Sequence, residues 1–194
     1  MPIVTVVNTK GGSGKTTSAF FLAYAAKQQN YDVRILDADP QGTATDWYYS
    51  LIESGEDAPF KVDSANAATM RRVGHIRDNE WLFIDTPPGD SQAITTAIEV
   101  ADFVVVPTSP KTADMWRTAP TVEALENRLY AVLITQGRVK TKGLEETIAQ
   151  LESEKISYFD DYIPLREAIA STVGNNPTDL YGYDKIFNEI RKAI

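Results

Sequence analysis

A glycine-rich segment near the start of the chain carries the residue types best suited to chemistry. It spans residues 8–17 and reads Asn-Thr-Lys-Gly-Gly-Ser-Gly-Lys-Thr-Thr. An apolar run precedes it and a helical pattern follows, which is the context that a phosphate-binding loop requires. Glycines let several N–H groups point into one concavity, and the start of the helix adds partial positive charge there. We therefore predict a nucleotide site, with Lys15 at the β- and γ-phosphates and the Thr16 hydroxyl on Mg²⁺.

Two acidic segments farther along the chain carry carboxylates that suit the same chemistry. Asp37 and Asp39 stand in Asp-Ala-Asp-Pro-Gln-Gly after a second apolar run, and Asp85 ends the run Trp-Leu-Phe-Ile. Ligands of parallel sheets bind just beyond the carboxyl ends of the strands. A buried strand that delivers one aspartate is typical of the Mg²⁺ site beside a nucleotide. Taken singly, these segments also fit an acidic turn and a helix cap near Ser91, but the order of all three motifs favours a nucleotide site.

Short apolar runs alternate with longer helical patterns, which is typical of an α/β fold with a mostly parallel sheet. The predicted strands are Ile3–Val7, Val33–Leu36, Trp81–Ile84, Phe103–Val106 and Tyr130–Ile134, with Ile156–Phe159 as a weaker candidate. The predicted helices are Gly14–Gln29, Ala44–Leu51, Asn66–Val73, Ser91–Val100, Met115–Asn127, Leu144–Glu154, Leu165–Thr172 and Asp184–Ala193. Several strands are continuously apolar, as expected where both faces of a sheet are covered. We therefore predict three layers, with helices flanking the central sheet.

Composition narrows the class of protein. The chain has 194 residues, a formal net charge of -8, one histidine and no cysteine. This length fits a single domain over residues 1–194, with no separate DNA-binding domain before the first strand. The lack of cysteine excludes disulfides, thiolate zinc sites and iron–sulfur clusters. No apolar run approaches the roughly 20 residues of a membrane span, and the N-terminus does not read as a signal peptide. We therefore expect a cytoplasmic protein.

The phosphate-loop segment departs from the ordinary pattern in one informative way. Thr9 stands where a glycine is usual, and a second lysine, Lys10, stands beside it. The resulting Lys-Gly-Gly-x-Gly-Lys-Thr resembles the deviant Walker A motif of the ParA/MinD family of ATPases, which implies a P-loop NTPase fold. Asp-Pro-Gln-Gly resembles the first switch of that family, and the segment that begins at Asp85 resembles its Walker B motif and second switch. The resemblance covers most of the chain and is strongest over residues 3–110.

This resemblance implies roles for individual residues. Those that would contact the nucleotide are Lys10, Gly11, Gly12, Ser13, Gly14, Lys15, Thr16, Thr17, Gln136 and Pro164, the last two at the adenine. Those in the metal shell would be Thr16, Asp37 and Asp85, and the catalytic residues would be Lys10, Lys15 and Asp39. In the family's mechanism, Asp39 would polarise the water that attacks the γ-phosphate. A buried strand end and a turn proline explain Gln136 and Pro164 equally well.

Lys10 is the residue that implies an oligomer. In the ParA/MinD family this signature lysine crosses a two-fold interface to the phosphates bound by the other subunit. The resemblance thus implies a homodimer that forms with ATP and separates when Mg²⁺-dependent hydrolysis yields ADP and phosphate. The alternative is that Lys10 is a solvated lysine at the edge of the loop.

Within the family, the chain most resembles a small ParA-type ATPase of plasmid or chromosome partition. Such an ATPase binds DNA nonspecifically as the ATP dimer, associates with the nucleoid and is stimulated by a ParB-like centromere-binding partner. A basic segment free of acids, residues 137–142, supplies candidate DNA contacts in Arg138, Lys140 and Lys142. Contacts with phosphates need no base readout and weaken as salt rises. The competing interpretation of this segment is a solvated loop.

Two other functions stay open at the level of the sequence. A MinD-like membrane-associated ATPase needs a basic amphipathic terminal helix, and residues 183–194 are amphipathic but carry Asp184 and Glu189. A helix folded onto the sheet explains that pattern more simply, so we expect no membrane binding. A metabolic ligase or phosphotransferase on the same fold needs an acceptor pocket, for which the chain has few insertions. Iron-protein and arsenite-pump relatives require cysteines, which this chain lacks.

Overall fold

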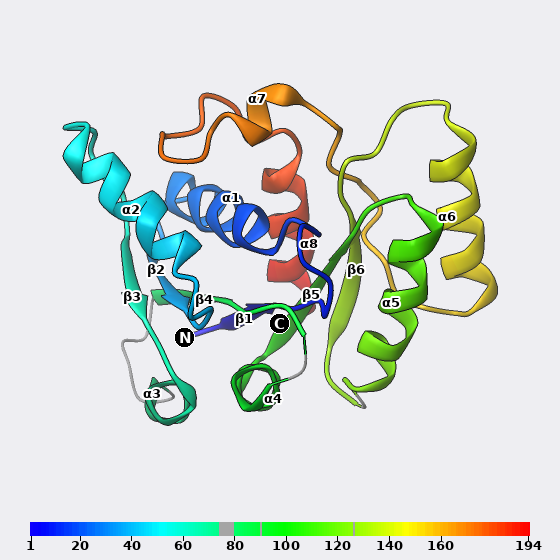
Figure 1. Ribbon diagram of the computed structural model, residues 1–194, viewed down its shortest axis with the longest axis horizontal. Coiled ribbons are helices and arrows are strands. Elements are labelled where there is room, and N and C mark those ends of the chain that lie inside the picture. The colour runs from blue at the N-terminus through cyan, green and yellow to red at the C-terminus, as the bar shows by residue number, and fades with distance from the viewer. Residues whose placement is uncertain (74–79, 90, 126) are drawn as a thin grey trace.

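The computed structural model describes residues 1–73, 80–89, 91–125 and 127–194, and a six-stranded sheet lies at its centre (Figure 1). All its strand pairs are parallel, in the order β3-β2-β4-β1-β5-β6. The strands are β1 (Ile3–Val6), β2 (Asp32–Asp37), β3 (Lys61–Ser64), β4 (Glu80–Asp85), β5 (Phe103–Thr108) and β6 (Tyr130–Ile134). Because β1 lies between β4 and β5, the loop after it opens at the middle of the sheet's carboxyl edge.

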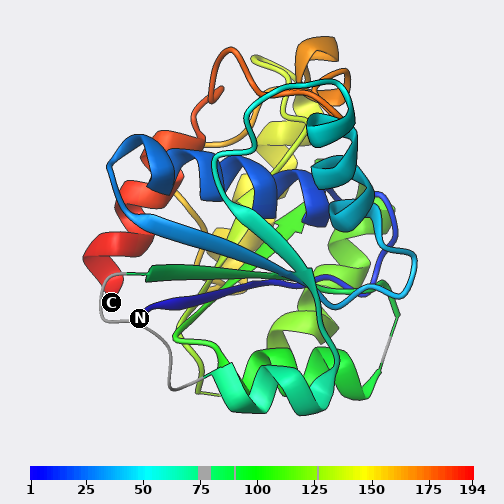
Figure 2. The same ribbon diagram turned by 90° about the vertical axis from the view of Figure 1, so that its left-hand side faces the viewer.

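Helices cover both faces of the sheet (Figure 2). The first face carries α1 (Lys15–Gln28), α2 (Thr43–Glu53), α7 (Glu167–Ala170) and α8 (Tyr183–Ala193). The second carries α3 (Ala67–Arg72), α4 (Gln92–Val100), α5 (Thr112–Glu123) and α6 (Lys142–Ser153). Side chains alternate between the two layers along each strand, so that Phe103 and Val105 of β5 face the first layer and Val104 and Val106 the second. This arrangement confirms the predicted three-layer α/β fold.

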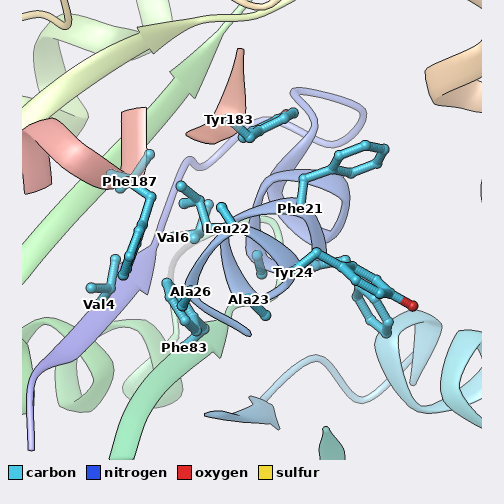
Figure 3. Packing of buried hydrophobic residues seen from close by; sticks show 14 of the residues in the cluster. Val4, Val6, Phe21, Leu22, Ala23, Tyr24, Ala26, Phe83, Tyr183 and Phe187 are labelled. Carbon is cyan, nitrogen blue, oxygen red and sulfur yellow. The ribbon is translucent and has the colours of Figure 1, made fainter. Parts of the chain in front are cut away.

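Helix α1 forms a firm base for the loop that precedes it. Its segment over residues 19–26 is buried on all sides, between the sheet and the helices α2 and α8. Phe20 stacks on Trp47 of α2 with ring centroids 4.1 Å apart, and Phe21 stacks on Tyr183 of α8 at 5.0 Å (Figure 3). Each such buried side chain contributes roughly 1.5–3 kcal/mol, so the start of α1 is anchored by packing well beyond its own hydrogen bonds.

The C-terminal helix α8 packs its apolar stripe into the core. Its buried residues are Tyr183, Ile186, Phe187 and Ile190. Phe187 meets Trp81 of β4 with ring centroids 4.7 Å apart, and it lies beside Val4 of β1 (Figure 3). These four side chains are therefore already covered by the sheet and α1, while the terminal Ile194 is 42% exposed. Over the described ranges, no helix is both long and apolar enough to span a membrane.

Two strand predictions need correction. The edge strand β3 has no counterpart among the predicted strands, because only Val62 of its four residues is buried and no apolar run marks it. The predicted strand Ile156–Phe159 forms only an isolated bridge between Tyr158 and Val132. Its backbone does bond to the outer strand, as the Val132 N–H donates to the Ser157 carbonyl at 2.8 Å. The segment therefore touches the edge of the sheet without extending it.

Two helix predictions also shift. The predicted helix Leu165–Thr172 contracts to α7, because the Leu165 N–H is bonded to the Gly137 carbonyl at 2.9 Å and holds that end extended. Helix α5 begins before the predicted Met115 and ends at Glu123. Glu126, within the predicted span of that helix, lies outside the described residues.

Candidate nucleotide site

The loop between β1 and α1 bends through left-handed backbone at two glycines. Gly12 has a φ of +74° and Gly14 a φ of +92°, a conformation that residues with a Cβ rarely adopt. Gly14 is also the N-cap of α1, and among the described residues no side chain caps this helix start. The N–H groups of the first turn are therefore free to meet an anion at the positive end of the helix dipole.

The three sequence motifs meet around one hollow of about 310 Å³, called here the phosphate hollow. Its lining residues are Gly11, Gly12, Gly14, Lys15, Thr16, Thr17, Asp39, Thr43 and Pro88. The segment after β4 is tied to the loop, because the Gly89 N–H donates to the Thr9 carbonyl at 2.8 Å. A concavity that combines backbone N–H groups with a lysine is suited to phosphate oxygens.

Lys15 lies against the loop with its ammonium group folded inward. The Nζ donates to the Lys10 carbonyl at 2.9 Å. Burial lowers the pKa of Lys15, and the nearby carboxylates of Asp85 and Asp39 oppose that shift. An ammonium that has lost part of its hydration gains more from a charged hydrogen bond than one in open solvent. Lys15 is thus placed to gain from an arriving phosphate.

Lys10 has a different environment from Lys15. Its half-exposed ammonium pairs with the buried carboxylate of Asp114 in the first turn of α5, and Asp114 also accepts a hydrogen bond from Ser109. The Lys10 N–H donates to Asn8 Oδ1 at 2.9 Å, and the Asn8 amide donates to the Pro107 carbonyl at 2.8 Å. The structure therefore holds Lys10 against its own chain, a contact that 104 residues of separation hide from sequence patterns.

Asp85 and Thr16 form the part of the site that suits a metal ion. Asp85 is fully buried, and its Oδ2 accepts a hydrogen bond from the Thr16 hydroxyl at 2.7 Å. Its Oδ1 is also buried and has no hydrogen-bond partner within the described residues. Burial raises the pKa of Asp85 to about 7, reinforced by Asp37 and Asp39 and opposed by the Thr16 hydrogen bond and Lys15. An unpaired carboxylate oxygen and a hydroxyl match the oxygen ligands of Mg²⁺, which needs only one or two carboxylates beside phosphates.

Asp37 and Asp39 make different contacts although they are two residues apart. Asp37 is buried, and its carboxylate accepts from the N–H and the hydroxyl of Thr45, each at 2.8 Å, and from the Asp39 N–H at 3.1 Å. It thereby fastens the start of α2 to the end of β2. Asp39 lines the phosphate hollow, and its Oδ1 accepts from the Gln41 N–H at 2.9 Å. The structure thus brings Asp39 to the phosphate side and gives Asp37 an anchoring contact that its spacing alone does not reveal.

A second hollow of about 260 Å³, called here the base pocket, shares Gly14 and Thr17 with the phosphate hollow. Its other lining residues are Thr135, Gln136, Ile163, Pro164, Leu165, Arg166, Ile169, Ala170 and Tyr183. Both residues predicted at the adenine, Gln136 and Pro164, are among them. The pocket therefore adjoins the phosphate hollow along Gly14 and Thr17.

Backbone pairing assembles this pocket from two distant segments. The Ile163 N–H donates to the Ile134 carbonyl at 2.8 Å, and the Gly137 N–H donates to the Ile163 carbonyl at 2.9 Å. A Cβ at Gly137 would lie 2.4 Å from the Tyr162 ring, so only glycine fits there. The Thr135 hydroxyl donates to the carbonyls of Ser13 and Thr108, both at 3.1 Å. Thr135, Gly137, Ile163 and Tyr183 were not among the predicted site residues.

Comparison with known proteins bears directly on this geometry. A model of the CobQ/CobB/MinD/ParA nucleotide-binding domain matches residues 4–178. The chain belongs to this family. Within it, the chain is 36% identical over 155 residues to the maintenance of carboxysome distribution protein A of Gloeobacter kilaueensis, covering 75% of this chain and 67% of that one. It is 26% identical over 188 residues to the chromosome-partitioning ATPase Soj of Thermus thermophilus, covering 77% and 75%.

Among solved structures, this CobQ/CobB/MinD/ParA domain is similar to a putative plasmid partition protein of Borrelia burgdorferi B31 bound to AMPPNP. The TM-score is 0.79 at 18% identity, and the match covers 99% of this chain and 97% of that one. At this identity the likeness shows the fold alone. It extends over almost all of both chains, so the phosphate hollow and the base pocket lie within the shared architecture.

The basic segment of this family member lies beyond β6, at the same edge of the sheet as the phosphate loop. Arg138, Lys140 and Lys142 are exposed, and Lys142 pairs with Glu146 at 3.2 Å. A Cβ at Gly143 would lie 3.0 Å from the Pro110 carbonyl oxygen, so the starts of α5 and α6 adjoin. The exposed Lys111, at the start of α5, is thereby brought near this segment, which only the tertiary structure reveals.

Proposed function

We propose that this CobQ/CobB/MinD/ParA-family domain is a ParA-type ATPase that partitions DNA. The observation that carries the proposal is the meeting of the phosphate loop and Asp39 at one hollow, where the Thr16 hydroxyl also donates to the buried Asp85. Relatives named for carboxysome distribution and chromosome partition support a role in positioning a cargo.

The proposed reaction is hydrolysis of ATP to ADP and phosphate. A water attacks the γ-phosphorus while the bond to the bridging oxygen breaks, and Asp39 at the hollow polarises that water. Lys15 and the N–H groups of the loop stabilise the charge that develops on the phosphate oxygens. Mg²⁺, held by Thr16 and Asp85, would supply further positive charge when bound. Asp37 keeps the loop that carries Asp39 fastened to α2.

The proposed switch is an ATP-dependent homodimer in which Lys10 reaches the nucleotide of the other subunit. Two ATP polyanions facing each other repel unless cations lie between them. Lys10 can supply one such cation, because its side chain is partly exposed and it directly precedes Gly11, which lines the phosphate hollow. Its present partner is Asp114, so dimer formation would exchange one ion pair for another. Hydrolysis removes the γ-phosphate, so the negative charge that attracts Lys10 away from Asp114 is lost and the dimer separates.

The proposed DNA contacts are Arg138, Lys140 and Lys142, and we add Lys111. The formal net charge of the chain is -8, but these cations gather at one edge of the sheet. They form a local positive surface on an otherwise acidic protein. Such contacts with phosphates would give nonspecific binding and association with the nucleoid. A ParB-like centromere-binding protein would then be the partner that stimulates hydrolysis.

The test is binding of the purified protein to a nonspecific duplex at fixed salt, with ATP·Mg²⁺, ADP·Mg²⁺ or no nucleotide. We expect binding only with ATP, weakening as salt rises. Replacing Arg138, Lys140 and Lys142 with alanine should reduce the salt slope by about three, roughly one for each cation removed from a phosphate. The matched control replaces three exposed cations elsewhere, Lys61, Arg72 and Lys155, with alanine. Equal losses in both variants, or binding in every nucleotide state, would contradict the proposal.

A further inference from the structure

One exposed side of α2 combines apolar and acidic side chains that the nucleotide site does not use. Tyr49 and Ile52 are 55% and 47% exposed, and Tyr48 lies beside Tyr49 with ring centroids 5.5 Å apart. Asp46 and Glu53 are exposed on the same helix, and α2 contains no lysine or arginine. Helical spacing places Asp46, Tyr49 and Glu53 in one row. These five residues are called here the α2 face.

The loop before α8 packs against α2 and carries another exposed apolar side chain. A Cβ at Gly174 would lie 3.5 Å from Ser50 Cβ, and the Trp47 indole donates to the Asn175 carbonyl at 3.1 Å. This loop is therefore fixed against α2. Val173, which precedes Gly174, is 50% exposed. The loop thus carries a further exposed apolar side chain next to a glycine that packs against α2.

We propose that the α2 face docks a basic amphipathic segment of a partner protein. The inference rests on the proposed function and deepens it by locating a surface for a partner. Exposed apolar side chains grouped on one face mark interaction sites more often than isolated ones do. The carboxylates of Asp46 and Glu53 favour an occupant rich in lysine or arginine, because like charges facing each other across an interface oppose binding. The same row repels DNA and the anionic surfaces of membranes.

The α2 face is connected to the phosphate hollow by a short path. Thr43, the first residue of α2, lines that hollow. Asp37 holds the N–H and hydroxyl of Thr45 and the N–H of Asp39, all within 3.1 Å. A partner docked on α2 therefore contacts the helix that shares its anchor with the loop carrying Asp39.

The test uses the full chain and a dye-labelled synthetic peptide of leucine and lysine, about four helical turns long, at physiological ionic strength. We expect anisotropy titrations to show binding to the wild type. Two variants, Tyr49→Ser with Ile52→Ser and Asp46→Lys with Glu53→Lys, should each weaken binding about tenfold, as removal of interface anchors does. All four side chains are exposed, so both variants should fold, which circular dichroism verifies.

Matched controls separate a defined surface from general attraction to an acidic protein. Leu129→Ser removes an exposed apolar side chain elsewhere, and Glu123→Lys with Glu154→Lys makes the same change in charge on other helices. Both should bind the peptide like the wild type. No binding by the wild type, wild-type affinity in both α2 variants, or equal weakening in the controls would each overturn the docking surface.

Nucleotide binding and ATP-dependent DNA binding are measured on the same preparations. If both are intact while the peptide result is negative, the docking surface fails and the proposed function stands. If the wild type binds no nucleotide, the proposed function fails, and the peptide titrations still decide whether the α2 face binds a basic segment.

Discussion

The phosphate hollow and the base pocket adjoin each other but are held together in different ways. The phosphate hollow is formed mainly by one continuous segment, residues 11–17, whose backbone follows directly from its glycines. The base pocket needs residues 135–137 and 163–166, which meet only because their backbones pair at the edge of the sheet. The first is thus resistant to changes elsewhere in the chain, whereas the second depends on distant packing.

Lys15→Ala should produce the largest effect, because Lys15 is buried and is the only cation among the described residues that line the phosphate hollow. We expect ATP affinity to fall about a hundredfold or more, as truncation of a buried charged contact does. Titration with a fluorescent ATP analogue measures this loss. Thermal unfolding serves as the control, since an affinity loss that merely followed a lowered melting temperature would contradict the assigned role.

Asp39→Ala should separate chemistry from binding at the same hollow. The Asp39 carboxylate lines the hollow and accepts a hydrogen bond from Gln41 in its own loop, and not from the phosphate loop, so ATP affinity should change little. Turnover should fall at least about a hundredfold, which is the usual contribution of a positioned general base. Single-turnover hydrolysis with saturating ATP measures the chemical step. Turnover within a few-fold of the wild type would remove Asp39 from the mechanism.

Gly137→Ala should damage the base pocket and leave the phosphate hollow intact. The new Cβ would meet the Tyr162 ring at 2.4 Å, so the two paired segments must shift apart. We expect a loss of about 1–3 kcal/mol in unfolding free energy, typical of overpacking, and weaker binding of ATP. Inorganic triphosphate, which has no base, should bind as it does to the wild type.

The double variant Gly137→Ala with Tyr162→Ala tests the cause of that loss. Removing the ring makes room for the new methyl group, so the double variant should bind ATP better than Gly137→Ala alone. Tyr162→Ala by itself completes the cycle. Additive losses in the double variant would show that the clash is not the reason.

Asp114→Asn should have the smallest effect, and it acts on the ion pair between Asp114 and Lys10. It weakens the intrachain ion pair of Lys10, so less is lost when Lys10 moves to another partner. ATP-dependent dimerisation should tighten about fivefold, because solvent screening at the partly exposed Lys10 limits the contribution of its pair with the buried Asp114 to about 1 kcal/mol. Sedimentation at several protein concentrations measures the change. Lys10→Ala should instead abolish the dimer, and weaker dimerisation by Asp114→Asn would reverse our interpretation of this pair.

The fold was predictable from the sequence wherever an element carries its own pattern. Five of the six strands are apolar runs, and their positions follow from that pattern because both faces of the sheet are covered. The edge strand β3 was not predicted, because only one of its four residues is buried and the segment therefore contains no apolar run. The predicted strand at Ile156–Phe159 was wrong for the opposite reason, since an apolar run can pack beside a sheet without joining it.

The phosphate loop and its carboxylates are what the sequence determined by itself. Glycines that require left-handed backbone and a lysine beside them act through neighbours a few residues away, so their spacing already describes their geometry. Asp85 meets Thr16 across 69 residues, but its position followed from the end of a buried strand, where ligands of parallel sheets bind. Only the tertiary structure decided the partner of Lys10, the pairing that brings Gln136 near Pro164, and the burial of the α8 stripe. These depend on which distant surfaces meet when the layers close, and a linear pattern does not contain that information.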